Sequence, residues 1–180
     1  RTRKLLSHYE IPTRTISYHE HNEFSRTPQI IEMMKEGKNV ALVTDAGMPG
    51  ISDPGAYLVD SALSNGLRVV PIPGPSAVIS ALSVSGFSAD EFMFLGFLPR
   101  KGKRRNEVLE SLVWETRVAV IYESPYRLLK TLSDLASVLG GNRKAVVTRE
   151  LTKLHEEVIR GTLAELLQEF SAKTVKGEIT

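Results

Sequence analysis

The stretch that decides the fold is VTDAGMPGISDPG, residues 43–55. It follows a short apolar run at 40–43 and leads into a segment with helical periodicity at 54–65. A short apolar run is typical of a strand buried on both faces, as in parallel sheets. The order strand, glycine-rich loop, helix predicts an α/β protein, in which ligands bind at the carboxyl ends of the strands.

Within this loop, the residue types favour contact with a bound molecule. Gly47 allows the backbone to adopt a positive φ or to approach a ligand closely. Ser52 and Asp53 precede Pro54, and an N-cap side chain followed by proline is a common helix start. Capping therefore remains the alternative to ligand binding for these two residues. For Asp45, at the end of the predicted strand, we favour a ligand role over a turn-forming hydrogen bond.

Strand and helix signals alternate along the rest of the chain. Helices are predicted over 1–9, 25–36, 75–84, 103–114, 125–139 and 162–170, and strands over 68–72, 92–97, 118–122, 145–148 and 157–160. The last two strands are too close in sequence for a helical crossover, so we expect them to pair antiparallel. Thr162 and Glu165 have the spacing of a capping box. Three prolines within 71–75 form a stiff connection, which predicts two domains, 1–72 and 73–180.

Composition narrows the class of protein. The chain has 180 residues, 42% hydrophobic and 24% charged, as in ordinary globular proteins. It has no cysteine, which excludes disulfide scaffolds and cysteine nucleophiles. No apolar run approaches the roughly 20 residues of a transmembrane helix, and the opening residues lack the apolar core of a signal peptide. We therefore expect a cytoplasmic protein without membrane contact.

Several motifs that would identify other classes of enzyme are absent from this sequence. Neither the glycine pattern of dinucleotide-binding folds nor that of P-loops follows a predicted strand. The GxSxG motif of serine hydrolases is also missing. His19 and His21 share one face of an extended segment without a third ligand nearby, so we predict no metal site.

Positive charge is concentrated in one short segment. The net charge of the chain is only +2. Five of its basic residues nevertheless fall within 100–105, namely Arg100, Lys101, Lys103, Arg104 and Arg105. Such a cluster is typical of a surface that binds a polyanion, and a solvated helix start is the alternative. For Arg149 and Glu150, which follow a predicted strand, a surface ion pair is the alternative to a functional role.

Five segments resemble, in order along the chain, the motifs of the tetrapyrrole (corrin/porphyrin) methylase superfamily. Residues 43–55 and 73–77 carry the resemblance to the superfamily. Residues 96–101, 122–127 and 148–153, which read GFLPRK, YESPYR and TRELTK, are similar to its ribosomal RNA small-subunit methyltransferase I branch. The resemblance implies two α/β domains that bind S-adenosylmethionine in the cleft between them. It also implies a homodimer that methylates a cytidine ribose 2′-hydroxyl in 16S ribosomal RNA of the small subunit.

The resemblance also assigns site residues, motif by motif. The implied cofactor contacts are Asp45, Gly47, Met48, Pro49, Ser52, Asp53, Ser76, Ala77, Tyr122 and Leu151. The candidates for the general base that takes the ribose proton are Glu123, Glu150 and Lys153. The candidates for contacts to RNA phosphates are Arg100, Lys101, Lys103, Arg104, Arg105, Arg127 and Arg149.

The two ends of the sequence depart from the family pattern. Arg1 lies inside a predicted helix, and 176–180 have the pattern of an opening strand. We expect a fragment, truncated at both ends, that lacks the first strand and the last strands and therefore binds the cofactor poorly. Two other functions remain open: a methylase of porphyrin or corrin precursors, and a non-catalytic ribosome-binding protein.

Overall fold

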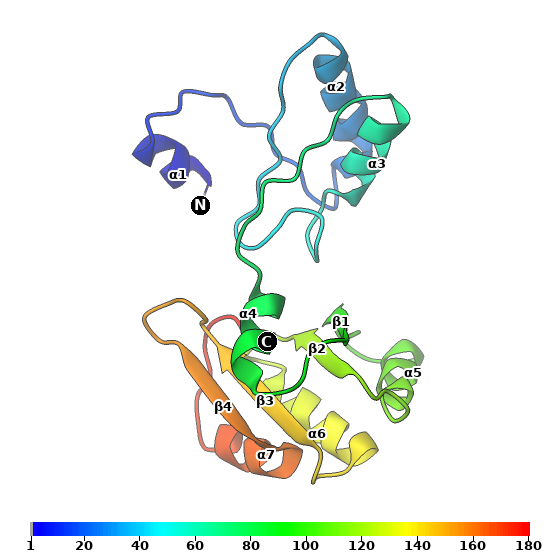
Figure 1. Ribbon diagram of the computed structural model, residues 1–180, viewed down its shortest axis with the longest axis vertical. Helices are drawn as coiled ribbons and strands as arrows, with labels where there is room; N and C mark the ends of the chain where they lie inside the picture. Colours follow the sequence, from blue (N-terminus) through cyan, green and yellow to red (C-terminus); the bar gives the residue numbers. More distant parts are fainter. Residues whose placement is uncertain (1) are drawn as a thin grey trace. The chain divides into compact units, whose positions relative to one another are not determined.

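The structure, a computed structural model, describes residues 2–180. The chain divides into two compact units, one ending at Ser76 and one running from Ala77 to Thr180 (Figure 1). The division directly follows the proline-rich run 71–75, in which we expected the domain boundary. Each unit has its own cluster of buried apolar side chains, as independent domains do.

The regular structure described in the first unit is helical. It consists of α1 (Thr2–His8), α2 (Glu23–Lys35) and α3 (Ala56–Ser64). Helices α2 and α3 lie side by side (Figure 1) and bury Ile30 and Ile31 of α2 against Leu58 and Ala62 of α3. Leu58 and Ala62 are four residues apart and therefore lie on one face of α3. The helices predicted in this unit are confirmed, except that Arg1, at which the first of them was expected to begin, lies outside the described residues.

The two strands predicted in the first unit, over 40–43 and 68–72, do not form. Neither segment joins a β-ladder within residues 2–76. Three of their apolar side chains are more than half exposed, with exposed fractions of 55% for Val43, 55% for Val70 and 76% for Ile72, whereas Leu42 packs against the cluster of α2 and α3. An extended segment becomes a strand when a neighbour satisfies its backbone hydrogen bonds, and an apolar run alone supplies no neighbour. The prediction of strands buried on both faces is therefore wrong.

The second unit contains both sheets of the described structure, and its strands lie where the sequence placed them. They are β1 (Phe92–Phe97), β2 (Val118–Tyr122), β3 (Lys144–Arg149) and β4 (Glu157–Thr162). Strand β1 pairs parallel with β2, whereas β3 pairs antiparallel with β4. The antiparallel pairing expected for the last two strands is confirmed.

Ile179, close to the end of the chain, links the two sheets. It forms antiparallel bridges with Glu123, just after β2, and with Arg149, the last residue of β3. Because β2 and β3 are each antiparallel to the same segment, they run in the same direction, and so does β1. The carboxyl ends of these three strands therefore lie at one edge, which we call the carboxyl edge. It carries the loops 98–102, 123–127 and 150–156.

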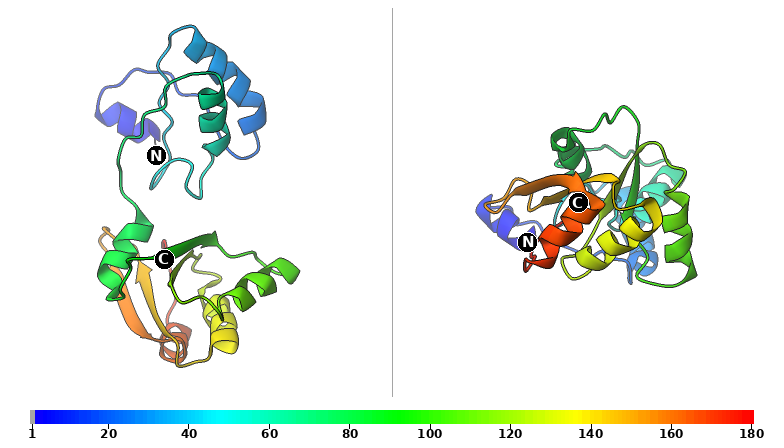
Figure 2. Two further views of the ribbon diagram at one scale, coloured as in Figure 1. Left: turned by 45° about the vertical axis from the view of Figure 1, so that its right-hand side comes forward. Right: turned by 90° about the horizontal axis from the view of Figure 1, so that it is seen from below.

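Helices cover both faces of these strands (Figure 2). The helices are α4 (Ala77–Ser85), α5 (Lys103–Ser111), α6 (Leu128–Leu139) and α7 (Leu163–Ser171). On one face, Val78 and Leu82 of α4 pack with Val120 of β2. On the other, α6 and α7 pack with Val147 of β3 and bury Phe170. This α/β arrangement agrees with the predicted fold class and holds the carboxyl edge between helical layers.

Helix α7 begins as its sequence predicted. The Thr162 hydroxyl accepts a hydrogen bond from the Glu165 backbone N–H (3.2 Å), and the Glu165 carboxylate accepts one from the Thr162 N–H (2.8 Å). These reciprocal bonds form a capping box, which satisfies backbone donors that the first turn of a helix leaves unpaired. The capping-box prediction is confirmed.

Candidate functional site

The glycine-rich loop 44–55 of the first unit is fixed by its own contacts. The Thr44 hydroxyl donates a hydrogen bond to the Asp53 carboxylate across nine residues (2.7 Å). Gly47 has a φ of 72° and Ser52 a φ of 56°, so the glycine adopts the positive φ that was one of the two uses expected for it. Asp45 and Gly47 are exposed on the surface of the loop. The loop therefore presents a carboxylate and an accessible stretch of backbone.

Asp53 does not cap helix α3, contrary to the alternative that its spacing had left open. The N-cap residue is Gly55, and no side chain caps this helix. The Asp53 carboxylate accepts the Thr44 hydroxyl instead, so Pro54 lies before the helix rather than in its first turn. On the other side of the loop, the Met48 sulfur would lie 3.2 Å from a Cβ placed on Gly74. The loop is thereby packed against the proline-rich run.

Gly55 leaves no room for a side chain. A Cβ there would lie 2.9 Å from Cδ2 of Leu42 and 3.1 Å from the backbone nitrogen of Gly50, and its φ is 150°. We expect Gly55→Ala to lower the free energy of unfolding of the first unit by about 1–3 kcal/mol. Gly37→Ala is the matched control, because its φ is also positive but nothing lies within 4 Å of the added Cβ. Equal losses in urea unfolding of the two variants would rule out the close approach as the cause.

The carboxyl edge of the second unit carries an exposed basic surface. Arg100, Lys101, Lys103 and Arg104 are all exposed in the loop after β1 and the first turn of α5. We call these four residues the basic segment. In the neighbouring loop, after β2, the Tyr126 side chain is 99% exposed. Exposed positive side chains and an exposed aromatic ring on neighbouring loops are a combination that suits single-stranded nucleic acid.

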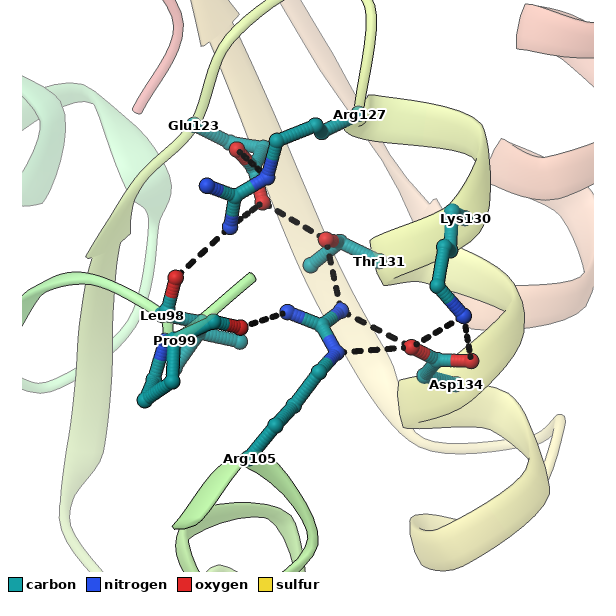
Figure 3. A network of polar contacts seen from close by, with 8 residues as sticks. All are labelled: Leu98, Pro99, Arg105, Glu123, Arg127, Lys130, Thr131 and Asp134. Carbon is teal, nitrogen blue, oxygen red and sulfur yellow. Dashed lines mark hydrogen bonds and ion pairs between the residues drawn. The ribbon is translucent and has the colours of Figure 1, made fainter. Parts of the chain in front are cut away.

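Arg105 is not part of this exposed surface. It is 4% exposed. Its guanidinium group points toward Asp134, Thr131 and Pro99 (Figure 3). Its guanidinium donates hydrogen bonds to the Asp134 carboxylate (2.9 Å), the Thr131 hydroxyl (3.0 Å) and the Pro99 carbonyl (2.9 Å). All three nitrogens of the guanidinium group thus donate to acceptors within the protein. This burial does not fit the predicted contact of Arg105 with RNA phosphates, and we assign Arg105 a structural role.

Glu123 forms the second half of the same buried network (Figure 3). One carboxylate oxygen accepts hydrogen bonds from the Thr131 hydroxyl (2.6 Å) and from Arg127 (3.2 Å). The other accepts the backbone N–H of Ser124 (2.8 Å) and lies 3.1 Å from Nε of Arg127. Arg127 also donates to the Leu98 carbonyl (2.7 Å). This geometry supports neither the predicted role of Glu123 as a general base nor that of Arg127 as an RNA contact.

The network anchors the start of the basic segment. Arg127 and Arg105 bind the consecutive carbonyls of Leu98 and Pro99, which directly precede Arg100. Two guanidinium groups face two carboxylates, so the buried charges are balanced, as buried charges must be. Burial alone would raise the pKa of Asp134, but the hydrogen bonds from Arg105 and Lys130 outweigh it and lower that pKa.

Sequence reasoning missed Thr131 and Asp134 as members of this network. The available signal was their spacing from Arg127, since residues at i, i+4 and i+7 share one face of a helix. That face carries polar side chains in a helix whose other face is apolar. The spacing of residues within one helix, however, does not indicate which basic or acidic residue elsewhere in the chain will be their partner.

The third loop of the edge holds Glu150 and Lys153 in a cluster with Glu178. The Glu150 carboxylate accepts the Glu178 backbone N–H (2.8 Å) and the Lys153 ammonium (2.9 Å), and Lys153 also pairs with the Glu178 carboxylate (2.7 Å). The first two contacts lower the pKa of Glu150, and the two carboxylates raise the pKa of Lys153. Both shifts make these groups poorer proton acceptors at neutral pH, so they do not support the predicted role as general bases.

Arg149 pairs with Glu157 rather than with its neighbour Glu150. The two residues face each other across the β3–β4 ladder, with Nε of Arg149 2.8 Å from Oε2 of Glu157. Arg149 also donates to the Lys176 carbonyl (3.2 Å). Its guanidinium therefore ties three segments of the second unit together, and its predicted contact with RNA stays a prediction.

Acid is expected to destabilise the second unit in part through Glu157. The hydrogen bond from Arg149 outweighs burial and, with Lys173, holds the pKa of Glu157 below the usual 4.5. A carboxyl group with a lower pKa in the folded state stabilises the fold above its unfolded pKa, and this contribution disappears as the pH falls through the folded value. Below pH 4.5, the free energy of unfolding should therefore fall more steeply in the parent than in Glu157→Gln. Urea unfolding between about pH 3 and 7 measures both curves; parallel curves would contradict this assignment.

The remaining predicted cofactor residues lie at element ends. Ser76 is the last residue of the first unit and Ala77 the first of α4. Tyr122 ends β2, with its ring centroid 4.8 Å from that of Phe94, and Leu151 lies in the loop after β3. Pro49 lies in the loop of the first unit. Their contacts with a cofactor stay predictions.

Residues 2–180, which the structure describes, contain neither a candidate metal site nor a helix that could span a membrane. The rings of His19 and His21 lie 6.0 Å apart, and the described residues contain no group of three acidic, histidine or cysteine side chains that could hold a metal ion. Among the described helices, none has the length and apolar character needed to cross a membrane.

Comparison with known proteins defines the class. The family described as Tetrapyrrole (Corrin/Porphyrin) Methylases matches residues 3–167. The chain therefore belongs to the tetrapyrrole methylase family, which confirms the resemblance seen in the sequence.

Within the family, the chain is similar to proteins named "Ribosomal RNA small subunit methyltransferase I". It is 49% identical to the Synechocystis sp. protein of that name over 177 residues, which cover 98% of this chain and 63% of the relative. It is 48% identical to the Thermotoga maritima protein over 180 residues, or 100% of this chain and 80% of the relative. The chain thus spans less than two thirds of the first relative's length.

Solved structures share the fold at low sequence identity. The crystal structure of the methyltransferase CobJ has a TM-score of 0.64 at 18% identity, covering 93% of this chain and 72% of that one. Uroporphyrin-III C-methyl transferase from Thermus thermophilus, solved in complex with S-adenyl homocysteine, has a TM-score of 0.61 at 14% identity, covering 93% and 75%. These likenesses confirm the α/β fold class.

Proposed function

We propose that the protein transfers a methyl group from S-adenosylmethionine to ribosomal RNA of the small subunit. The observation that carries the proposal is the basic segment, four exposed cations anchored at the carboxyl edge of a tetrapyrrole methylase fold. Phosphate contacts by Lys and Arg supply most of the sequence-independent affinity for a nucleic acid. The relatives named as small-subunit RNA methyltransferases support the same substrate.

The acceptor that we propose is the 2′-hydroxyl of a cytidine ribose in 16S ribosomal RNA. The support is the sequence resemblance of 96–101, 122–127 and 148–153 to the branch of the family that carries out this reaction. Holding the hydroxyl at attack distance supplies up to about 7–11 kcal/mol of the barrier reduction. Because the carboxylates at the carboxyl edge are engaged in hydrogen bonds, we assign the main contribution to positioning.

The first unit has a surface that fits the proposed cofactor. Asp45 is an exposed carboxylate, which suits the hydroxyl and ammonium groups of S-adenosylmethionine. A Cβ at Gly47 would meet nothing within 4 Å, so the backbone there is open to a ligand. When bound, the cofactor supplies an activated methyl group on a sulfonium. Asp45 and the backbone near Gly47 would hold it and orient it.

Methyl transfer by the intact gene product tests the proposal. The protein is incubated with methyl-labelled S-adenosylmethionine and one of two substrates, in parallel reactions. One substrate is small ribosomal subunits from cells that lack the protein, and the other is uroporphyrinogen. We expect label in the RNA and none in the tetrapyrrole. Label in the tetrapyrrole alone would instead identify a porphyrin precursor methylase. Binding of subunits without any transfer or cofactor binding would identify a non-catalytic ribosome-binding protein.

Partners and location form part of the same proposal. The small ribosomal subunit is the partner, which places the protein in the cytoplasm. The family resemblance further supports a homodimer. Sedimentation equilibrium of the intact protein tests this part, since a single species with the mass of one chain would exclude the dimer.

A further inference from the structure

Tyr126 carries an aromatic ring that is almost completely open to solvent. Its side chain is 99% exposed, more than any other large hydrophobic side chain in the part of the chain that the structure describes. Tyrosine side chains in folded proteins usually bury about 150–250 Å². Tyr126 lies in the loop 123–127, which follows β2 at the carboxyl edge. A ring that the fold leaves open at this edge is available to a ligand.

The turn that carries Tyr126 is held by hydrogen bonds. The Ser124 carbonyl accepts the backbone N–H groups of Arg127 (3.0 Å) and Leu128 (3.1 Å). The Glu123 carboxylate accepts the Ser124 N–H (2.8 Å) and lies 3.1 Å from Nε of Arg127. These contacts close the turn on both sides of Tyr126, so its exposure is not that of a loose loop. A ring on a fixed turn loses little conformational freedom when it binds, which favours affinity.

The same buried network ties this turn to the basic segment (Figure 3). Arg127, which directly follows Tyr126, donates a hydrogen bond to the Leu98 carbonyl (2.7 Å). Arg100 comes two residues after Leu98, a stretch that spans at most about 7 Å of extended chain. The network therefore fixes the loop that carries the ring and the loop that carries the cations relative to each other.

An exposed ring and exposed cations match the two parts of a nucleotide. Phosphate groups bind to Lys and Arg side chains, whereas a base stacks on an aromatic face. Within a duplex, neighbouring bases cover both faces of each base, so an unpaired base is the one that can stack on a protein ring. We infer that Tyr126 is a stacking site for an unpaired base of an RNA strand whose phosphates the basic segment binds.

This inference rests on the proposed function, in which RNA is the substrate, and it narrows that substrate to a single-stranded segment. Tyr126 contacts the base. Glu123 and Arg127 contact no RNA and are positioning residues, which act through the turn. Because stacking tolerates every base, the site selects an open strand rather than a sequence.

Trp114 offers a matched control. Its side chain is 87% exposed. It lies four residues before β2 begins, whereas Tyr126 lies four residues after β2 ends. Trp114 is therefore an open aromatic ring at the other end of the same strand, away from the basic segment. If any exposed ring attracted RNA, Trp114→Leu and Tyr126→Leu would have the same effect.

Binding of short oligonucleotides to the intact gene product tests the inference. The probes are an oligocytidylate of about eight nucleotides, within the usual site size for single strands, and the same ribose–phosphate chain without bases. Fluorescence anisotropy at several salt concentrations measures both. We expect Tyr126→Leu to weaken oligocytidylate binding by about 5- to 150-fold, the loss that removal of one stacking ring causes, and to leave binding of the chain without bases unchanged.

Two further readouts separate stacking from charge and from stability. The slope of log K against log salt concentration should be the same in Tyr126→Leu and the parent, because no phosphate contact is lost. Tyr126→Phe keeps the ring and should bind as the parent does, and Trp114→Leu should do the same.

Several results would overturn the inference. They are equal oligocytidylate affinities of the parent and Tyr126→Leu, an equal loss in Trp114→Leu, and an equal loss with the chain without bases. A change in mass in sedimentation equilibrium of Tyr126→Leu would also overturn it and would identify a second copy of the chain as the partner of the ring.

Methyl transfer to small subunits, measured with the same preparations, reports on the proposed function separately. Transfer by the parent, together with unchanged oligocytidylate binding in Tyr126→Leu, would overturn the stacking site alone. Weakened binding in Tyr126→Leu without any transfer by the parent would overturn the proposed function alone.

Discussion

Arg105→Ala is expected to lower the free energy of unfolding of the second unit by about 3–5 kcal/mol, as removal of one partner from a buried ion pair does. The substitution leaves the Asp134 carboxylate without its buried cation. It also removes the N–H groups that donate hydrogen bonds to the Thr131 hydroxyl and to the Pro99 carbonyl. It also removes the anchor between α6 and the start of the basic segment. Urea unfolding followed by circular dichroism measures the loss.

Arg104→Ala is the matched control for this prediction. Arg104 is adjacent in sequence and carries the same charge, but its side chain is exposed. Exposed substitutions of this kind change stability by about 0.5 kcal/mol or less. Equal stabilities of the two variants would show that the network around Arg105 contributes nothing net to the fold.

Substitution of the basic segment is expected to weaken RNA binding strongly and to change stability little, the reverse of what we expect for Arg105→Ala. We expect the combined Arg100→Gln, Lys101→Gln, Lys103→Gln and Arg104→Gln variant of the intact protein to bind small-subunit RNA about 10- to 1,000-fold more weakly. The plot of log K against log salt concentration should also become less steep by about 3, because each lost phosphate contact removes about 0.7–0.9 from the slope. Filter binding at several salt concentrations gives both quantities.

A variant with the same change in net charge serves as the control. It exchanges four exposed basic residues of the first unit for glutamine, namely Lys4, Arg14, Lys35 and Lys38. We expect this variant to keep most of the affinity and the slope. If both variants lose the same affinity, the overall charge rather than the basic segment attracts the RNA.

The fold of the second unit was predictable because its signals are local. Strand and helix patterns fixed β1 and β2, and the short connection between β3 and β4 fixed their antiparallel pairing. The Thr162 and Glu165 pair marked the start of α7. In each case, the physical cause lies within a few residues of sequence. Ile179, by contrast, bridges segments that are far apart in the chain, and the strand pattern of 176–180 did not indicate which segments it would pair with.

The strands expected in the first unit show the limit of the same reasoning. The apolar runs at 40–43 and 68–72 have the composition of buried strands, yet a strand also requires a partner at hydrogen-bonding distance. An apolar composition indicates that a segment tends to be buried. It does not indicate whether a neighbouring strand is present to pair with it. Helices α2 and α3 required no such partner, because helical hydrogen bonds are internal and the two apolar faces cover each other.

The candidate site was predictable by residue type and not by environment. Arg104 and Arg105 are identical in the sequence, but one is exposed and the other is buried against Asp134. Glu123 has the chemistry of a general base, but its oxygens accept hydrogen bonds from Thr131, Ser124 and Arg127. A residue's role follows from its partners, and these partners lie on other elements or one helical turn away. The sequence alone therefore indicated the chemistry of these side chains but not their partners, and their roles in a site stay predictions.

The proposed methyl transfer to 16S ribosomal RNA is tested by mapping the methylated nucleoside with mass spectrometry. Small subunits from cells lacking the protein are treated with the intact gene product and labelled S-adenosylmethionine, and their 16S RNA is digested and analysed. We expect one new 2′-O-methylcytidine, which is lost in the variant with the four basic-segment substitutions and retained in the first-unit charge control. An RNA without label, when cofactor binding has been demonstrated in parallel, would contradict the proposed transfer.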